Sequence, residues 1–375
     1  MASKGGMMPV LNLYHLKFPR GIHIGRGGIE SLEDTLDYVP SDTLFAALID
    51  TWVYLGREVS ELLPEMTTPV IKVTSAFPYA GEVRFYPRPM DLRVLFSKSV
   101  LQREGGGKRL KKIRYLSEKL LLKAADGEKL DRYLFPEDEF EDPKEGNCLQ
   151  GGAFWLMKEE ENSLPLVWQM PESRRWTLRR KSIYSFQTIP RVTVDRINAA
   201  PNLFHSERIV FSEDCGLWFG VMGQSSDFPH LLTALGESGL GGERTAGYGH
   251  FSWVEKGSLN LPEVGDFTYI LSRWHPAANE VGLLKNEGSS YKLEAVGGWL
   301  RSSQLAAAQR RKRVWMVAEG SLIEGHPCGE AIDVAPKYED QGKPGSYMRS
   351  LSHPVYRAGF AVNMTWKWSG EDAET

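Results

Sequence analysis

The stretch between residues 239 and 251 carries the residue types best suited to binding chemistry. It reads Gly-Leu-Gly-Gly-Glu-Arg-Thr-Ala-Gly-Tyr-Gly-His-Phe and holds five glycines. Glycine adopts positive φ angles and lets the backbone come close to a ligand, so consecutive amides could form a nest for an anion such as a phosphate. Arg244 and Thr245 add further donors. The pattern predicts a phosphate-binding loop, and a plain turn whose glycines only reverse the chain stays open as the alternative.

The surroundings of this loop argue against the common nucleotide-binding fingerprints. We expect a helix over residues 228–240 before the loop and a strand through Phe251 and Val254 after it. That order is the reverse of the strand-then-helix setting of Rossmann and P-loop sites. No Gly-Lys-Ser or Gly-Lys-Thr occurs, and the glycines at 25–28 fail the dinucleotide pattern because position 30 is Glu30.

Size and charge limit where a polyanion could bind. The chain has 375 residues, 42% of them hydrophobic and 25% charged, which suits a soluble protein with two domains. The formal net charge is −3. Overall charge therefore does not attract nucleic acid, and any such site must rest on local positive charge.

The cysteines and the hydropathy bear on the cellular compartment. Cys148, Cys215 and Cys328 are far apart and form no C-x-x-C pair, which argues against a zinc ribbon or a disulfide scaffold. No apolar run approaches the ~20 residues that cross a bilayer. We expect a cytoplasmic protein with no membrane contact, no metal and no cofactor.

The elements that would position the loop form two similar halves. Each half combines strands with a helix, which predicts an α+β chain of two ferredoxin-like (RRM-like) domains with antiparallel sheets. The first domain would span residues 1–185, and the second, residues 186–375, would carry the glycine-rich loop. The expected elements are a strand at 10–18, a helix from 41 to about 62, strands at 70–77 and 83–86, strands at 191–197, 207–212 and 217–222, and the helix at 228–240.

A basic segment interrupts the first half. Residues 98–132 hold eleven Lys or Arg against five Asp or Glu. Such a block suits an exposed insertion, placed at about 98–181, that would protrude like a thumb and contact phosphates. A solvated helix face is the alternative. The cations proposed for such contacts are Lys108, Arg109, Lys111, Lys112 and Arg114.

Several further stretches resemble a known family. The glycine-rich loop is similar to that of the RAMP superfamily of CRISPR proteins. Residues 40–48 (Pro-Ser-Asp-Thr-Leu-Phe-Ala-Ala-Leu) resemble a helix start in its tag-binding fourth Csm subunit of type III-A effector complexes. Similar matches are Ser-Ala-Phe-Pro-Tyr at 75–79, Pro-Arg-Val-Thr-Val-Asp-Arg at 190–196 and His-Pro-Val-Tyr-Arg at 353–357.

The resemblance implies a function and partners. Such a subunit is not an enzyme; it binds the 5′ repeat-derived tag of the CRISPR RNA (crRNA). It lies beside the large polymerase/HD-domain subunit and a backbone RAMP subunit, and it meets target RNA only indirectly. The resemblance carries an RNA-binding role to Arg196, which Asp195 would orient, and to the loop residues Gly241, Gly242, Arg244, Thr245, Gly247, Tyr248 and Gly249.

Three residues outside the loop complete the expected RNA site. Arg20 and His23 follow the first strand in a glycine-rich turn, although exposed basic residues are often only solvated. Ser41 could present a helix N-terminus to a phosphate, and capping its own helix is the favoured alternative.

Other functions stay open at this point. Some RAMP relatives are metal-independent RNases that use a histidine, for which His15 and His23 are the N-terminal candidates. Neither has a partnered Tyr or Lys motif, and no metal-nuclease motif occurs. The type III-B counterpart of the tag-binding subunit and a purely structural bridge are the remaining alternatives.

Overall fold

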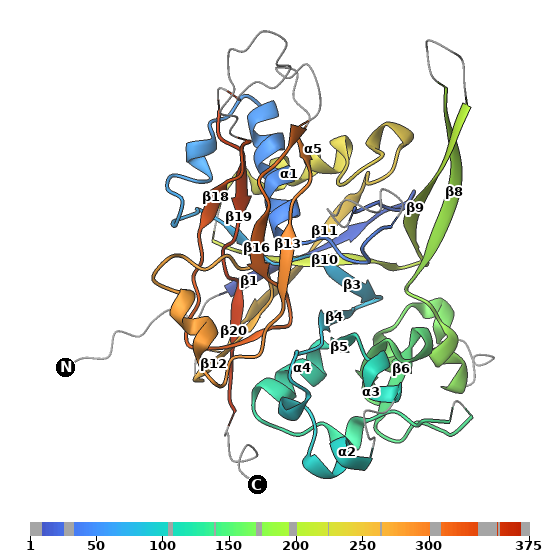
Figure 1. Ribbon diagram of the computed structural model, residues 1–375. Coiled ribbons are helices and arrows are strands. Elements are labelled where there is room, and N and C mark those ends of the chain that lie inside the picture. The colour runs from blue at the N-terminus through green and yellow to red at the C-terminus, as the bar shows by residue number, and fades with distance from the viewer. Residues whose placement is uncertain are drawn as a thin grey trace.

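The structure of the chain is a computed structural model (Figure 1). It describes residues 10–25, 34–103, 108–138, 140–169, 175–194, 201–223, 225–262, 265–300, 309–336, 351 and 353–368. Among these residues, no helix combines the length and apolar character that crossing a bilayer requires.

A nine-stranded sheet forms the body of the molecule. Its strand order is β11-β1-β10-β3-β4-β5-β7-β6, with β2 paired to β10 beside β3. All neighbours are antiparallel except β5 and β7. The strands are β1 (Val10–Lys17), β2 (Lys72–Val73), β3 (Phe77–Ala80), β4 (Val83–Pro87), β5 (Tyr115–Ser117), β6 (Gly146–Leu149), β7 (Phe154–Met157), β10 (Cys215–Met222) and β11 (Ser252–Asn260).

Two glycines let the central strands approach each other. Strand β10 is buried along nearly its whole length. A Cβ at Gly220 would stand 2.3 Å from Leu11 Cγ, and one at Gly216 would stand 2.2 Å from the Leu16 carbonyl oxygen. Larger residues at these positions would push β10 away from β1, so the glycines are needed for close packing.

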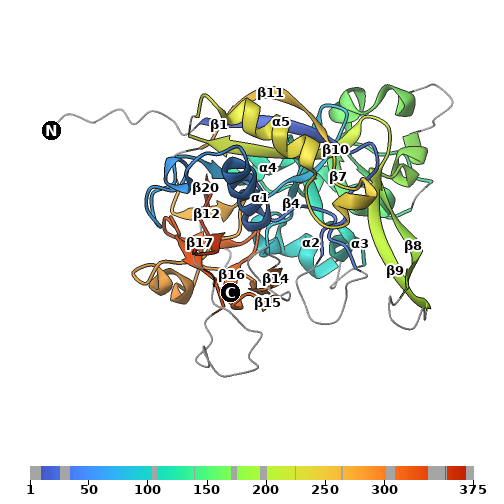
Figure 2. The same ribbon diagram turned by 90° about the horizontal axis from the view of Figure 1, so that it is seen from above.

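Helices α1 (Ser41–Tyr54) and α5 (Phe228–Ser238) contact each other and lie side by side against the sheet (Figure 2). The apolar stripe of α1 is buried, as its spacing predicted. The predicted extension of this helix to residue 62 is wrong. The chain turns at Gly56, where φ is 78°, and Val59–Glu61 form a separate 3₁₀ turn.

The large sheet crosses the predicted domain boundary. Along the chain, these elements follow the order β1, α1, β3, β10, α5, β11, whereas the strands lie side by side in the order β11-β1-β10-β3. Strands from both sides of residue 185 therefore form one sheet. Helix α5 and the glycine-rich loop connect two strands of this sheet, β10 and β11. The boundary at 185/186 needs correction, because sequence order alone did not show that β10 pairs with β1.

The basic segment is packed into the body of the molecule. Residues 98–181 form α2 (Lys98–Arg103), α3 (Lys108–Lys112) and α4 (Glu118–Ala125), and they supply β5, β6 and β7 to the large sheet. The prediction of a protruding thumb at 98–181 is therefore wrong. The element that projects is the hairpin of β8 (Tyr184–Val194) and β9 (Pro201–Phe211), seen at the upper right of Figure 1.

The C-terminal part consists of small antiparallel sheets. Strands β12 (Phe267–Ile270), β17 (Leu322–Glu324) and β20 (Asn363–Trp366) form one sheet. The predicted class, α+β with antiparallel sheets, is confirmed, but the described residues from 265 onward contain no α-helix. The two-stranded ribbons pair β13 (Leu293–Val296) with β16 (Val314–Val317), β14 (Trp299–Leu300) with β15 (Gln309–Arg310), and β18 (Ala331–Asp333) with β19 (Tyr356–Ala358).

Candidate nucleic-acid interface

The glycine-rich loop lies against the turn that follows β1. The Gly242 amide donates to the His23 carbonyl oxygen at 2.9 Å, and the Gly249 amide donates to the Gly21 carbonyl oxygen at 2.9 Å. A Cβ at Gly241 would stand 2.3 Å from the His23 carbonyl oxygen. The glycines therefore allow two backbone segments, more than 200 residues apart, to lie in direct contact.

This contact changes the role expected for the glycines. Besides Gly242 and Gly249, the amide of Gly239 donates to the Leu235 carbonyl and that of Gly247 to the Arg244 carbonyl. These four amides already have acceptors inside the protein, so they are not free to bind an anion, and RNA binding by the loop stays a prediction. The glycines position side chains instead.

The loop presents its polar side chains on a short turn. Arg244 and Thr245 are exposed on the 3₁₀ turn Arg244–Ala246. Left-handed residues flank this turn, with Glu243 at φ 56° and Gly247 at φ 82°. The two chain reversals direct the guanidinium and the hydroxyl group toward solvent, where an anion could reach both.

Guanidinium groups from three segments gather around Tyr248. The Tyr248 ring is buried, and the Cζ atoms of Arg191 and Arg208 lie 5.2 Å and 4.9 Å from its centroid. Both arginines come from the β8–β9 hairpin, and Arg208 Nη1 donates to the Arg20 carbonyl oxygen at 3.1 Å. We define Arg20, Arg191, Arg208 and Arg244 as the arginine cluster. Tyr248 is thus a packing platform beneath two cations.

The arginine cluster carries excess positive charge. Arg191 pairs with Glu243 at 3.0 Å. In the described part of the chain, Arg20, Arg208 and Arg244 have no carboxylate within 4 Å. The Nε atoms of Arg191 and Arg208 are buried and have no acceptor. Since unpaired guanidinium donors at a partly desolvated surface favour an anion, this is the strongest candidate site for phosphates.

Sequence reasoning identified half of the cluster. Arg20 and Arg244 were predicted and are brought together. Arg191 and Arg208 were missed as binding residues, because only the pairing of β8 with β9 brings them to Tyr248. Arg191 does lie in the motif at 190–196 that supports the family resemblance, but the motif alone did not mark it as a binding residue.

Two other predicted residues have structural roles here. His23 is buried, and its Nδ1 lies 2.6 Å from the Glu207 carbonyl oxygen. Ser41 is also buried, and its hydroxyl accepts from the Arg273 amide at 2.8 Å instead of capping α1. The preferred capping role of Ser41 is therefore wrong.

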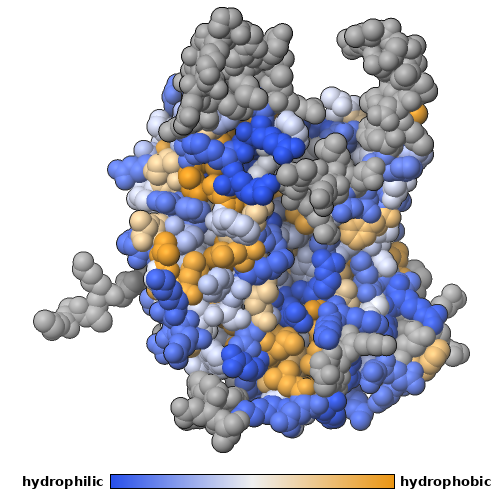
Figure 3. Space-filling model, viewed as in Figure 1, coloured by the Kyte–Doolittle hydropathy of each residue, from blue (hydrophilic) through white to orange (hydrophobic). Residues whose placement is uncertain are grey.

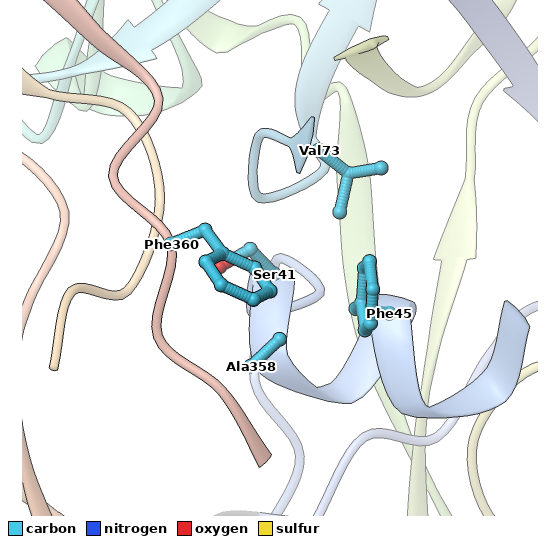
Figure 4. Close-up of a pocket in the computed structure, with 5 residues that line it drawn as sticks. All are labelled: Ser41, Phe45, Val73, Ala358 and Phe360. Carbon is cyan, nitrogen blue, oxygen red and sulfur yellow. The ribbon is translucent and has the colours of Figure 1, made fainter. Parts of the chain in front are cut away.

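Figure 4 shows Ser41 at a seam between α1 and the C-terminal part. The cavity there has room for about 10 Å³, near the lower limit for one water molecule, and Phe45 and Phe360 close it. Ser41 thus faces the interior of the protein and not a surface that RNA could reach.

The remaining predicted contacts are dispersed. Arg114 pairs with Asp37 at 2.8 Å, and Arg109 Nη1 donates to the Phe135 carbonyl oxygen at 2.7 Å. Lys111 and Lys112 are exposed on α3. Arg196 lies outside the described residues, as does the side chain of Lys108, so the structure does not place these two groups.

An acid–base role for His15 conflicts with its surroundings. Its ring is buried and stacked on Tyr79, with centroids 3.9 Å apart. Burial, with the nearby charges of Arg84, Lys256 and Lys17, lowers the pKa of His15 to about 3. The imidazole therefore stays neutral and inaccessible near pH 7, where an RNase would need it to exchange protons. Among the described residues, no group of His, Cys, Asp and Glu could hold a metal ion.

The motifs behind the resemblance meet inside the protein. Asp42 and Arg357 form a buried ion pair of 2.6 Å between Oδ2 and Nη1. The Ser75 hydroxyl donates to the buried carboxylate of Glu319, and Arg273 pairs with Glu294 at 2.7 Å. This buried polar network joins α1 to the C-terminal strands. The motifs at 40–48, 75–79 and 353–357 thus hold the molecule together.

The comparisons with known proteins agree with this architecture. Residues 263–366 match the family described as CRISPR Csm4 C-terminal domain. The chain is 24% identical over 331 residues to the CRISPR system Cms protein Csm4 of Thermococcus onnurineus, covering 85% of this chain and 91% of that protein. It is 26% identical over 330 residues to the protein of the same name from Mycobacterium tuberculosis, covering 86% and 91%.

Solved structures share the fold. A chain in the crystal structure of a Csm3–Csm4 subcomplex of the type III-A CRISPR-Cas interference complex superimposes with a TM-score of 0.60 at 16% identity, covering 95% of this chain and 99% of that chain. A chain of a Csm1–Csm4 cassette in complex with pppApA gives 0.53 at 17% identity, covering 96% and 99%.

The matched C-terminal region and the relatives place the chain among proteins similar to CRISPR-system proteins, and the solved structures share its fold. More specifically, residues 263–366 match the Csm4 C-terminal domain, and the chain is similar to Csm4 proteins along nearly its whole length. The resemblance predicted from the four sequence motifs is thereby confirmed.

Proposed function

We propose that the chain is the non-catalytic, crRNA-binding subunit of a type III-A complex and holds the 5′ repeat-derived tag of the guide. The observation that carries this proposal is the arginine cluster. The guanidiniums of Arg191 and Arg208 lie on Tyr248, Arg20 Nη1 lies beside Gly247, and Arg244 is exposed in the same loop. Among the described residues, only Glu243 forms an ion pair with any of these four arginines.

The chemistry of the cluster suits an RNA backbone. A guanidinium is planar and offers paired donors that match two phosphate oxygens. Thr245 adds a hydroxyl donor beside Arg244. Contacts of this kind fix the register of a strand and carry little base information, which suits recognition of a constant tag.

The arginine cluster lies on a domain whose order of strands and helices is typical of a known fold. We propose that β1, α1, β3, β10, α5 and β11 form one ferredoxin-like domain, since they follow its βαββαβ order. Residues 81–214, inserted between β3 and β10, then carry β4, β5, β6, β7 and the projecting hairpin. The C-terminal sheets form a second unit, tied to α1 through the buried polar network.

The partners are proposed from the relatives. Structurally similar chains are found in a Csm3–Csm4 subcomplex and in Csm1–Csm4 cassettes. By analogy, this chain would contact a backbone RAMP subunit and the large polymerase/HD-domain subunit, and it would meet target RNA only through the guide.

Incubation of the purified protein with tag-bearing repeat RNA, with and without EDTA, tests this function. We expect a shifted band, no cut product in either condition, and an affinity that falls steeply with salt because bound phosphates release counterions. Cut product resistant to EDTA would favour the metal-independent RNase, and no shift at low salt would contradict tag binding.

A further inference from the structure

Two tryptophans stand exposed on the ribbons of the C-terminal part, far along the chain from the arginine cluster. Trp315 of β16 lies opposite Ala295 of β13, and Trp299 of β14 lies opposite Arg310 of β15. Trp315 is 60% exposed and Trp299 is 49% exposed. Exposed aromatic groups that lie near one another commonly mark an interaction site, because their burial would be favourable.

Trp315 lies on the outer face of the β13–β16 ribbon, and Trp299 lies on the next ribbon, β14–β15. Leu293 and Ala295 are exposed while Val296 is buried, and Trp315 is exposed while Met316 is buried. This alternation puts Trp315 on the outer face. Trp299 follows Ala295 by four residues, so the two Cα atoms lie at most about 13 Å apart at ~3.3 Å per residue, and Gly298, at φ 132°, turns the chain between them. Figure 3 shows pale and orange residues at the surface where Figure 1 places β13 and β16, with hydrophilic residues beside them.

Positive charge surrounds these aromatic rings. Residues 291–300 and 309–318 hold five Lys or Arg and one carboxylate, that of Glu294. Glu294 is already occupied by Arg273 and Lys292, each at 2.7 Å. The Cζ atom of Arg310 lies 4.9 Å from the Trp299 ring centroid.

The neighbouring cations lack carboxylate partners. Arg310, Lys312 and Arg313 are exposed and, among the described residues, have no carboxylate within 4 Å. We call Trp299, Trp315, Arg310, Lys312 and Arg313 the tryptophan face.

We propose that the tryptophan face binds single-stranded nucleic acid, as a second site beyond the one proposed for the guide tag. Bases stack on exposed aromatic rings, while unpaired cations neutralise the phosphates between them. A protein partner fits less well, since three cations without carboxylate partners would have to be desolvated against it. A duplex also fits less well, because its stacked bases cannot reach the rings.

The test uses the full chain carrying Arg20→Ala and Arg244→Ala, so that the guide-tag site does not dominate binding. Fluorescence anisotropy with a short single-stranded oligouridylate compares this parent with Trp299→Ala, Trp315→Ala and the pair of Trp→Phe changes. We expect each alanine change to weaken binding roughly tenfold, the Phe pair to keep most of the affinity, and ultraviolet crosslinks to map to 291–300 and 309–318.

Thermal melting of each variant checks the fold, and the exposed side chains should leave it unchanged. Binding within twofold of the parent for both alanine variants would overturn the proposal. So would retained RNA affinity combined with loss of a co-purifying protein subunit, which would make the face a protein interface. Wild-type tag binding is measured separately, so the two proposals can fail independently.

Discussion

Replacing Arg357 by alanine is expected to lower the free energy of unfolding by about 3 to 5 kcal/mol. The change leaves the carboxylate of Asp42 buried without its closest cation, which now lies 2.6 Å away. Arg273 compensates only in part, because its Nε is 3.8 Å from Asp42 and its Nη2 is engaged with Glu294. Urea unfolding followed by fluorescence measures the loss.

A surface pair provides the matched control for this change. Lys17 and Asp214 are 3.0 Å apart and about half exposed, so Lys17→Ala should cost no more than about 1 kcal/mol. Removing both buried charges, with Asp42→Asn and Arg357→Met, should recover part of the lost stability, because no isolated charge then remains. An Arg357→Ala protein as stable as the Lys17→Ala protein would show that the buried pair does not hold α1 to the C-terminal strands.

Replacing Arg20 and Arg244 together by alanine is expected to weaken binding of tag-bearing RNA about a hundredfold. Each guanidinium would lose a charge-assisted bond to phosphate worth roughly 1.5 kcal/mol or more, and 1.4 kcal/mol is a factor of ten. The slope of affinity against salt should also fall by about one for each lost phosphate contact. Anisotropy titrations at several salt concentrations give both quantities.

The matched control removes the same charge elsewhere. Arg57 and Lys119 are exposed and lie outside the arginine cluster, and both form surface ion pairs. Their double alanine variant should bind RNA within about twofold of wild type, because screening limits distant charges. An equal loss of RNA affinity in both variants would indicate that binding depends on the overall charge of the protein and not on the arginine cluster. Unchanged affinity in the Arg20 and Arg244 variant would favour the structural bridge.

Local sequence signals predicted individual elements well. The alternation at β1, the stripe of α1 and the branched and aromatic residues of β10 each reflect burial on one or both faces, which a single segment records. Strand pairing is different, because it depends on partners distant in sequence. For that reason the boundary at 185/186 and the thumb at 98–181 were wrong, and the helices and strands within residues 98–181 were not predicted.

The residues of the candidate site also fall into those that the sequence predicted and those that only the tertiary structure shows. Residue type indicated Arg20, Arg244 and Thr245 as donors, and the structure brings them to one surface. Sequence could not show that the glycine amides donate within the protein, since hydrogen-bond partners follow from tertiary contacts. Nor could it show that Asp42 and Arg357, recognised through separate motifs, form one buried pair.

Ultraviolet crosslinking of the guide RNA in the assembled particle, with mass spectrometry of the attached peptides, tests the central claim most directly. We expect nucleotides of the 5′ tag to crosslink to peptides around Arg20 and within residues 241–250. Tag crosslinks confined to other subunits, with none to these two segments, would contradict the account.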